Sequence, residues 1–190
     1  MPPSRRRIAA IAIVVAFVAA ACGSDGTPEI SLGEDTETLG VGTASPDDLP
    51  GPTGTDDVFV TAYRDFNGGE QSLADVAEGR PVVLNFFASW CPTCVAEMPD
   101  FEAVNQQLSD QVQLVGLATE DAPGDALALA GRTGVTYPLG LDPAGAFFRV
   151  FQGLGMPTTA FLTAEGEVAH VFTGQLSDDA LVDRIEEFLL

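Results

Sequence analysis

Two apolar runs in the chain are continuous rather than alternating, and each has the length of a strand. They occupy residues 81–88 and 112–118. A strand that is apolar on both faces is typical of the centre of a parallel sheet with helices on both sides. We therefore expect these two segments to form the buried centre of a sheet.

Helical segments are predicted between and after these strands. Residues 91–108 have the pattern of a helix, kinked at Pro99. Ser72 and Ser177 are suited to cap a brief helix up to residue 78 and a final helix. The other predicted elements are helices over 126–132 and 144–152, a strand at 58–60, an extended piece at 137–141, and a hairpin of strands 158–163 and 168–172.

This order of elements predicts an α/β fold. Strands joined by helices in the first half and a strand hairpin in the second half indicate a central mixed sheet with helices on both faces. A length of 190 residues accommodates one such domain, which we place at 58–190, together with export and tether segments.

The first 21 residues have the pattern of a signal peptide. Arg5, Arg6 and Arg7 precede an apolar run of 14 residues, which is short for a membrane-spanning helix. Small residues then lead to Cys22, as in a bacterial lipobox, although Ala19 stands where leucine is usual. We expect cleavage before Cys22, lipid attachment to its thiol, and a position on the extracytoplasmic face of the cell membrane. Ordinary cleavage would instead leave Cys22 free and the protein secreted.

Residues 22–57 are expected to hold the anchor cysteine and a disordered acidic linker. Among residues 23–57, 20 are Gly, Pro, Ser or Thr, nine are acidic, six are apolar and none is basic. Such a segment cannot bury enough apolar surface to offset the entropy of ordering. We interpret it as a spacer that holds the domain away from the membrane.

Charge narrows the class of partners. Without the first 21 residues, five Arg remain against 28 acidic residues, a formal charge of −23. Such a surface repels nucleic acid and anionic lipid and favours basic or neutral partners. No nucleic-acid function is expected.

The candidate chemistry lies in the sequence Trp90-Cys91-Pro92-Thr93-Cys94, between a buried strand and a helix. A cysteine at a helix N-terminus is stabilised as the thiolate, the form that attacks disulfides. Cys94, one turn later, is placed to resolve the mixed disulfide. Pro92 suits the first helical turn, and Trp90 is expected to shield the sulfurs from one side.

Other uses of two closely spaced cysteines fit less well. A zinc site needs about four ligands, and a c-type haem site needs His directly after the second cysteine, where Val95 stands. A two-residue spacing closes too small a loop for a useful structural staple. We expect redox chemistry, with no metal and no cofactor.

The segment VVLNFFASWCPTC resembles the active-site strand and turn of thioredoxin. Together with NGGEQSLADVAEGRPVVLNF, GLGMPTTAFLTAEGEV and a helical insertion near residues 121–135, it is similar to the extracytoplasmic thioredoxin-like proteins of the TlpA/ResA/DsbE type. The resemblance runs from about Val58 to the C-terminus. It implies a thioredoxin-like fold and a protein-disulfide oxidoreductase.

The same resemblance implies roles for individual residues. The Met156–Pro157 bond would be cis and would lie against the cysteines, with the Met156 backbone pairing with a substrate strand. Trp90, Pro92 and Thr93 would complete the substrate-binding surface. Glu97, buried near Cys94, would have a raised pKa and move protons.

Two further polar residues lie on predicted strands. Asn85 occupies the position of a buried acid in thioredoxin, and an amide cannot shuttle protons. His170, the one His of the chain, is interpreted as a surface or partly buried strand residue.

The predicted function is disulfide exchange with exported proteins, with a membrane redox partner. Family resemblance favours a reductase, for example in cytochrome c maturation; a disulfide-forming oxidase is the alternative. A peroxidase, a copper-delivery protein and a non-catalytic binding lipoprotein are the alternatives of other classes. The peroxidase motif is not met, since Leu84 and Ala88 stand at its Pro and Thr/Ser positions before Cys91.

Overall fold

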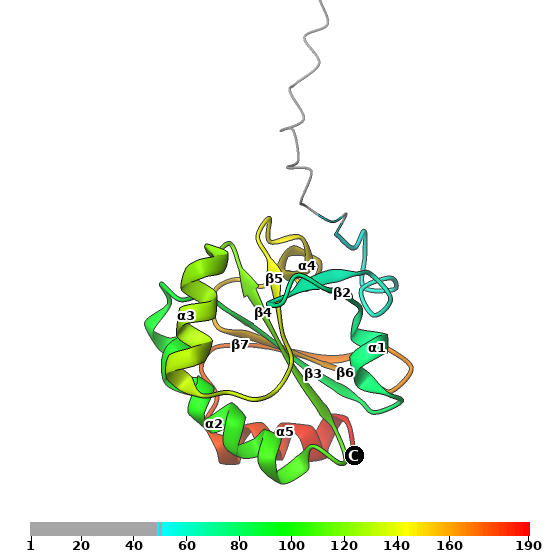
Figure 1. Ribbon diagram of the computed structural model, residues 1–190. Coiled ribbons are helices and arrows are strands. Elements are labelled where there is room, and N and C mark those ends of the chain that lie inside the picture. The colour runs from blue at the N-terminus through cyan, green and yellow to red at the C-terminus, as the bar shows by residue number, and fades with distance from the viewer. Residues whose placement is uncertain (1–48, 50) are drawn as a thin grey trace, which may run out of the picture. The chain divides into compact units, whose positions relative to one another are not determined.

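The computed structural model describes residue 49 and residues 51–190 (Figure 1). The predictions for residues 1–21, for lipid attachment at Cys22 and for most of the linker at 22–57 lie outside the described residues. No helix in the part that is described is both long and apolar enough to cross a membrane.

The described chain contains seven strands and five helices. In chain order they are β1 (Tyr63–Asp65), β2 (Glu70–Gln71), α1 (Leu73–Ala77), β3 (Val82–Phe87), α2 (Pro92–Leu108), β4 (Gln113–Thr119), α3 (Pro123–Thr133), β5 (Leu139–Asp142), α4 (Ala146–Val150), β6 (Thr158–Leu162), β7 (Val168–Thr173) and α5 (Asp178–Phe188).

The strands form one mixed sheet in the order β2-β1-β5-β4-β3-β6-β7. β4 is the middle strand and is parallel to both of its neighbours, β3 and β5, while β3 is antiparallel to β6. The two continuous apolar runs are thus adjacent central strands. The predicted α/β mixed sheet of thioredoxin-like type is confirmed.

Alternation along β3 divides the core into two layers. Val82, Leu84 and Phe86 pack with apolar residues of α1 and α4 on one face. Val83 and Phe87 point to the opposite face, which α2, α3 and α5 cover. In Figure 1, α2 and α5 lie side by side, in agreement with their direct packing. Helices therefore cover both faces of the sheet, as predicted.

The strand predicted at residues 58–60 is wrong. This segment is a turn in which the carbonyl oxygen of Asp57 accepts hydrogen bonds from the N–H groups of Val60 and Thr61. The Asp57 carboxylate also binds the N–H groups of Thr53 and Gly54. Val58 is fully buried, so its apolar character reports burial rather than an extended backbone.

Several element bounds also differ from the predicted ones. The helix predicted at 144–152 is reduced to α4, because Gly145 has a positive φ of 66° and Phe151 already leaves the helix. Helix α3 begins earlier than predicted, at Pro123. The domain boundary at residue 58 stays a prediction, and the residues described just before it form turns in which Pro52 is buried.

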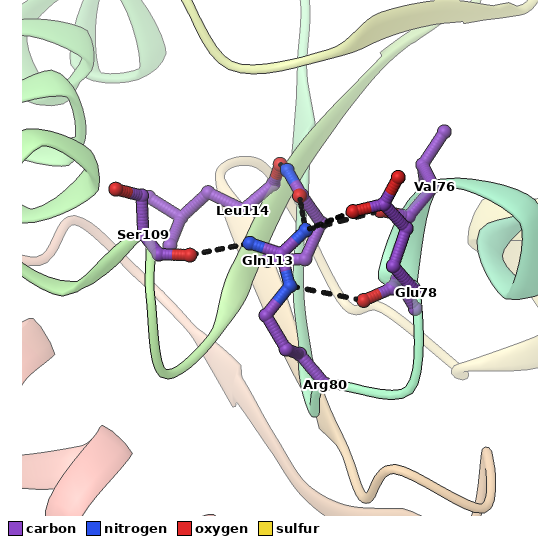
Figure 2. Close-up of polar contacts among 7 residues, drawn as sticks. Val76, Glu78, Arg80, Ser109, Gln113 and Leu114 are labelled. Atoms are coloured by element: carbon purple, nitrogen blue, oxygen red, sulfur yellow. Dashed lines mark hydrogen bonds and ion pairs between the residues drawn. The ribbon is translucent and has the colours of Figure 1, made fainter.

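Arg80 joins three elements at the edge of the domain opposite to the start of α2. Figure 2 shows its guanidinium group donating hydrogen bonds to the Ser109 carbonyl oxygen at the end of α2 and to Gln113 Oε1 on β4. The Nε atom donates to the Ala77 carbonyl oxygen, 3.1 Å away, at the end of α1. The side chain thus pairs with the Ser109 carbonyl oxygen at the end of α2 and adds a second hydrogen bond to the Ala77 carbonyl oxygen, which also accepts from the Arg80 N–H group.

Candidate redox site

The junction of β3 and α2 positions the cysteine pair. Cys91 is the N-cap of α2, with an extended backbone (φ −98°, ψ 105°), and Pro92 occupies the first turn. The Cys94 N–H group donates to Cys91 Sγ at 3.2 Å. The sequence predicted a helix starting at Cys91; the structure places this residue at the cap, where its sulfur takes the place of an oxygen acceptor.

Cys91 and Cys94 form a disulfide, with an S–S distance of 2.08 Å and a Cα–Cα distance of 5.3 Å. Cys91 is 5% exposed and Cys94 is fully buried. The Thr93 hydroxyl, on the exposed side, lies 3.4 Å from Cys91 Sγ. An attacking thiol can therefore reach only the first sulfur of the pair.

An apolar cluster surrounds the two sulfurs. Its buried members come from β3, α2, β4 and α3 and comprise Phe87, Ala88, Met98, Ala118, Ala126 and Leu129, together with the cysteines. Met156 packs against this cluster, whereas Trp90 does not belong to it and is 59% exposed. The cluster excludes water from the side of the sulfurs that faces the sheet.

The peptide bond between Met156 and Pro157 is cis, as the resemblance implied. The carbonyl oxygen of Pro157 accepts a hydrogen bond from the N–H group of Gly174. Neither backbone polar group of Met156 has a hydrogen bond to another described residue. Leu154, two residues earlier, is 96% exposed. The backbone of Met156, a residue that packs against the disulfide cluster, is thus unpaired, and an exposed apolar side chain lies two residues before it in the chain.

The loop before Cys91 is attached to the end of β4. The Ser89 N–H and hydroxyl groups donate to the Asp121 carboxylate at 2.6 and 2.8 Å, and the Trp90 indole N–H donates to the Glu120 carbonyl oxygen at 3.2 Å. Sequence reasoning missed Ser89 and Asp121. Their signal is that both directly follow adjacent parallel strands, whose carboxyl ends meet at one edge of the sheet.

Glu97 is fully buried on α2, one turn after Cys94. Burial raises the pKa of this carboxyl group to about 7, although two hydrogen bonds lower it. These bonds come from the Leu176 N–H group (3.1 Å) and from Asn85 Nδ2 (2.9 Å). The predicted burial and raised pKa are confirmed, while the contacts with Asn85 and Leu176 could not be read from the sequence.

His170 lies on β7, and its ring stacks on that of Phe188 at 4.2 Å with an angle of 9° between the planes. It is partly buried and takes no part in the disulfide cluster. The interpretation of His170 as an ordinary strand residue is confirmed.

Comparison with known proteins places the fold and the motif in a family. The family model Redoxin matches residues 51–188. The thiol-disulfide oxidoreductase ResA of Oceanobacillus iheyensis is 30% identical over 118 residues, which are 62% of this chain and 59% of that protein. The match to the thioredoxin-like protein YneN of Bacillus subtilis covers a larger share of the relative, 71% of its length.

Solved structures agree with this relationship. The structure of MTB dsbF in mixed oxidised and reduced forms covers 74% of this chain and 98% of its own, with 26% identity and a TM-score of 0.62. The pneumococcal exposed lipoprotein thioredoxin Etrx1 of Streptococcus pneumoniae covers 67% of this chain and 98% of its own, with 26% identity and a TM-score of 0.55. Both similarities extend over most of the domain that carries the cysteine pair.

Proposed function

The chain belongs to the redoxin family, and from this premise we propose that it exchanges disulfides with exported proteins through Cys91 and Cys94. One observation carries the proposal: a disulfide whose first sulfur caps a 17-residue helix and whose second is fully buried. A structural disulfide has no need of this asymmetry. An exchange catalyst needs one reachable sulfur and one protected sulfur.

Cys91 is the nucleophile in this proposal. In the reduced protein its thiolate faces the free N–H groups of the first turn of α2, which favour the charged form. The Cys94 N–H group, which already donates to Cys91 Sγ, is one of them. The Thr93 hydroxyl supplies another donor to the same sulfur.

The reductive direction balances in two steps. The Cys91 thiolate attacks a substrate disulfide, which forms a bond between Cys91 and one substrate sulfur and releases the other as a thiolate. Cys94 then loses its proton and attacks the Cys91 sulfur, which forms the Cys91–Cys94 disulfide and releases the second substrate thiolate. Two electrons pass to the substrate, and a membrane redox partner returns them.

Glu97 is the base for the second step. It is buried one turn from Cys94 and, with a pKa of about 7, is ionised in a large fraction of molecules near neutral pH. In the oxidative direction, the same group returns the proton to Cys94. Its location beside the protected cysteine supports this assignment.

The substrate backbone is expected to pair with Met156. The polar groups of this residue have no partner among the described residues, and its side chain packs against the cluster of the two cysteines. Exposed Trp90, Pro92 and Thr93 adjoin the cysteines in sequence, and exposed Leu154 is two residues before Met156. An extended segment bearing a cysteine fits such a surface, with Pro157 beside the sulfurs.

Export, anchoring at Cys22 and the reductase direction belong to the same proposal. The sequence of residues 1–22 supports export and lipid attachment, and a lipoprotein is named among the structural neighbours. The reductase direction, with cytochrome c maturation as an example, rests on the family resemblance. An oxidase remains the competing assignment.

Reduction of a protein disulfide tests the proposal. All variants carry Cys22→Ser, so that Cys91 and Cys94 are the only cysteines in the protein. The protein with an intact Cys91–Cys94 pair should accelerate the reduction of insulin disulfides by dithiothreitol. Cys91→Ser should abolish this acceleration. Cys94→Ser should accumulate a mixed disulfide between Cys91 and insulin. Equal activity of the Cys91→Ser variant would refute the assignment. Peroxide consumption that depends on Cys91, without insulin reduction, would favour a peroxidase instead.

The reduction potential of the pair decides the direction. A value near −270 mV, together with a reduced pair in the cell, supports a reductase, whereas about −120 mV and an oxidised pair support an oxidase.

A further inference from the structure

One polar atom beside the redox pair has no partner. Asn85 is 1% exposed, and its Oδ1 atom accepts no hydrogen bond within the described residues. The Nδ2 atom of the same amide donates to Glu97 Oε1 at 2.9 Å and to Thr159 Oγ1 at 3.4 Å. Buried amide oxygens without a partner are rare and costly, so this one calls for an explanation.

The surroundings of Glu97 suit only its ionised form. An ionised carboxylate accepts hydrogen bonds, and both neighbours of Glu97, Asn85 Nδ2 and the Leu176 N–H group, are donors. A protonated carboxyl group must itself donate one hydrogen bond. In the observed arrangement neither of its two partners can accept it, although the proposed role of Glu97 requires it to hold a proton during each cycle.

We propose that Asn85 is a positioning residue whose side-chain amide turns over when Glu97 takes up a proton, so that Oδ1 replaces Nδ2 opposite Glu97 Oε1. The acceptor that protonated Glu97 lacks is then supplied by the oxygen that is unpaired in the observed state. This inference rests on the proposed function, in which Glu97 exchanges a proton with Cys94.

The fold permits this motion at small cost. Rotation about the terminal bond of an asparagine is broad and two-fold, and it exchanges two groups of similar size. Thr159 faces Asn85 across the antiparallel pair of β3 and β6. Its hydroxyl group accepts from Nδ2 in the observed orientation and, after rotating, donates to Oδ1 in the other.

Each orientation leaves one polar group of the amide unpaired. With Glu97 ionised this group is Oδ1, and with Glu97 protonated it is Nδ2, which then points where Oδ1 pointed before. Neither protonation state is therefore favoured by the count of unpaired groups. A fixed amide, in contrast, would favour the ionised state alone.

Few other groups influence the protonation of Glu97. On α2 the titratable neighbours are Asp100, which raises the pKa of Glu97, and Cys94. Buried Tyr137, just before β5, senses the charge of Glu97, and its own pKa is raised mainly by burial. β3, β6 and the segment before α5 present Asn85, Thr159 and the Leu176 N–H group, which do not titrate. In the oxidised protein Cys94 is in the disulfide, so Glu97 titrates without it.

NMR of the oxidised full chain tests the inference directly. From about pH 5 to pH 9, the Glu97 carboxyl carbon and the Asn85 side-chain NH₂ group should change with one common midpoint. Nuclear Overhauser contacts from the Asn85 NH₂ protons to Thr159 should be strong above the midpoint and weak below it. Titration of Glu97 with unchanged contacts would overturn the inference.

Two variants sharpen the test. Asn85→Leu has a similar volume but can neither donate nor accept. Because a turning amide pairs with both forms of Glu97, its loss should move the midpoint of Glu97 by less than about half a pH unit, whereas loss of a fixed amide, which pairs with the carboxylate alone, should raise the midpoint by about one unit. The matched control, Tyr137→Phe, removes a buried hydroxyl that has no partner in the described chain, and it should keep the contact switch of Asn85. A midpoint raised by about one pH unit in Asn85→Leu would indicate a fixed amide and would count against the inference.

The readout separates this inference from the proposed function. With the pair reduced, the pH profile of mixed-disulfide resolution in Asn85→Leu should keep nearly the midpoint of wild type, whereas loss of a fixed amide would shift this profile to higher pH. A full chain that fails to reduce disulfides would overturn the proposed function and leave the amide titration intact. If Asn85→Leu does not fold, the nuclear Overhauser contacts of Asn85 in the wild-type protein still test the inference.

Discussion

Glu97 is a buried acid that no positive side chain neutralises within the described part of the chain. Its contacts are an amide and a backbone N–H group, which lower the pKa by less than burial raises it. Because the net result is a pKa of about 7, ionisation of this group in the folded protein opposes folding at neutral pH. The residue is thus retained at a cost in stability, which agrees with a role in proton transfer.

This cost has a definite pH dependence. The pKa of Glu97 is raised in the folded state from 4.5 to about 7, so its favourable contribution is complete below pH 4.5 and is lost as the pH rises through 7. At pH 8 a shift of this size corresponds to roughly 3 kcal/mol against folding. We expect Glu97→Gln to stabilise the oxidised protein relative to wild type more at pH 8 than at pH 4.

Urea unfolding at the two pH values measures this difference. Glu187→Gln, on the outer side of α5, is a suitable control, because Glu187 is exposed and its replacement should change stability by less than ~0.5 kcal/mol at either pH. If the stability difference between wild type and Glu97→Gln were the same at both pH values, the raised pKa of Glu97 would not contribute to stability in this way.

At the scale of elements, caps and buried runs made most of the fold predictable. Ser72 and Ser177 cap α1 and α5 as expected, since a capping residue is recognised from its immediate neighbours. The two- and three-residue strands β2 and β1 were missed, because alternation needs about four residues to be distinguished from chance. The turn at 58–60 is closed by the carbonyl oxygen of Asp57, which accepts from Val60 and Thr61, and a hydropathy pattern does not register such backbone bonds.

The candidate site also has one part that the sequence predicted and one part that it did not. Its contiguous part, from Trp90 to Cys94, was identified from spacing. The contacts of Glu97 with Asn85 and Leu176 join residues 12 and 79 positions apart in the chain, and no local pattern encodes them. Asn85 was interpreted only as an amide that cannot carry protons. Its contact with Glu97 depends on the packing of α2 against β3, and its contact with Thr159 depends on the register of β3 against β6.

Arg80 allows a prediction about how the elements are held together. Arg80→Met keeps an apolar stem but leaves the carbonyl groups of Ala77 and Ser109 and the side chain of Gln113 without this donor. We expect the free energy of unfolding to fall by about 2 kcal/mol, measured by denaturant titration.

The ion pair of Arg80 supplies the matched control. Glu78 lies 3.6 Å from the guanidinium group and is 77% exposed. An exposed pair of this kind contributes little, so Glu78→Gln should change stability by no more than ~0.5 kcal/mol. Equal losses in the two variants would mean that charge, and not the bonds to carbonyl groups, gives Arg80 its importance.

For the whole molecule, charge should govern which substrates react fastest. The chain has 28 acidic residues and 8 basic ones. Such a field attracts basic partners over a distance set by ionic strength. A model disulfide peptide flanked by Lys should react about tenfold faster than one flanked by Glu at low salt, and the ratio should approach one near 1 M salt.

Stopped-flow rates of the two peptides over a range of salt concentrations provide the measurement. The intrinsic reactivity of both disulfides toward glutathione serves as the reference, since neighbouring charges also alter the peptides themselves. A rate ratio that does not respond to salt would show that contacts at the site, rather than the overall charge, select the substrate.

Trp90 is the one tryptophan of the chain, and it directly precedes Cys91. Its indole is more than half exposed and donates a hydrogen bond to the Glu120 carbonyl oxygen, so the fold holds the side chain of the residue that precedes Cys91. A disulfide is an efficient quencher of a nearby excited indole, whereas a dithiol is a weaker one. We therefore expect the intrinsic fluorescence of the protein to follow its oxidation state during turnover, without any added label.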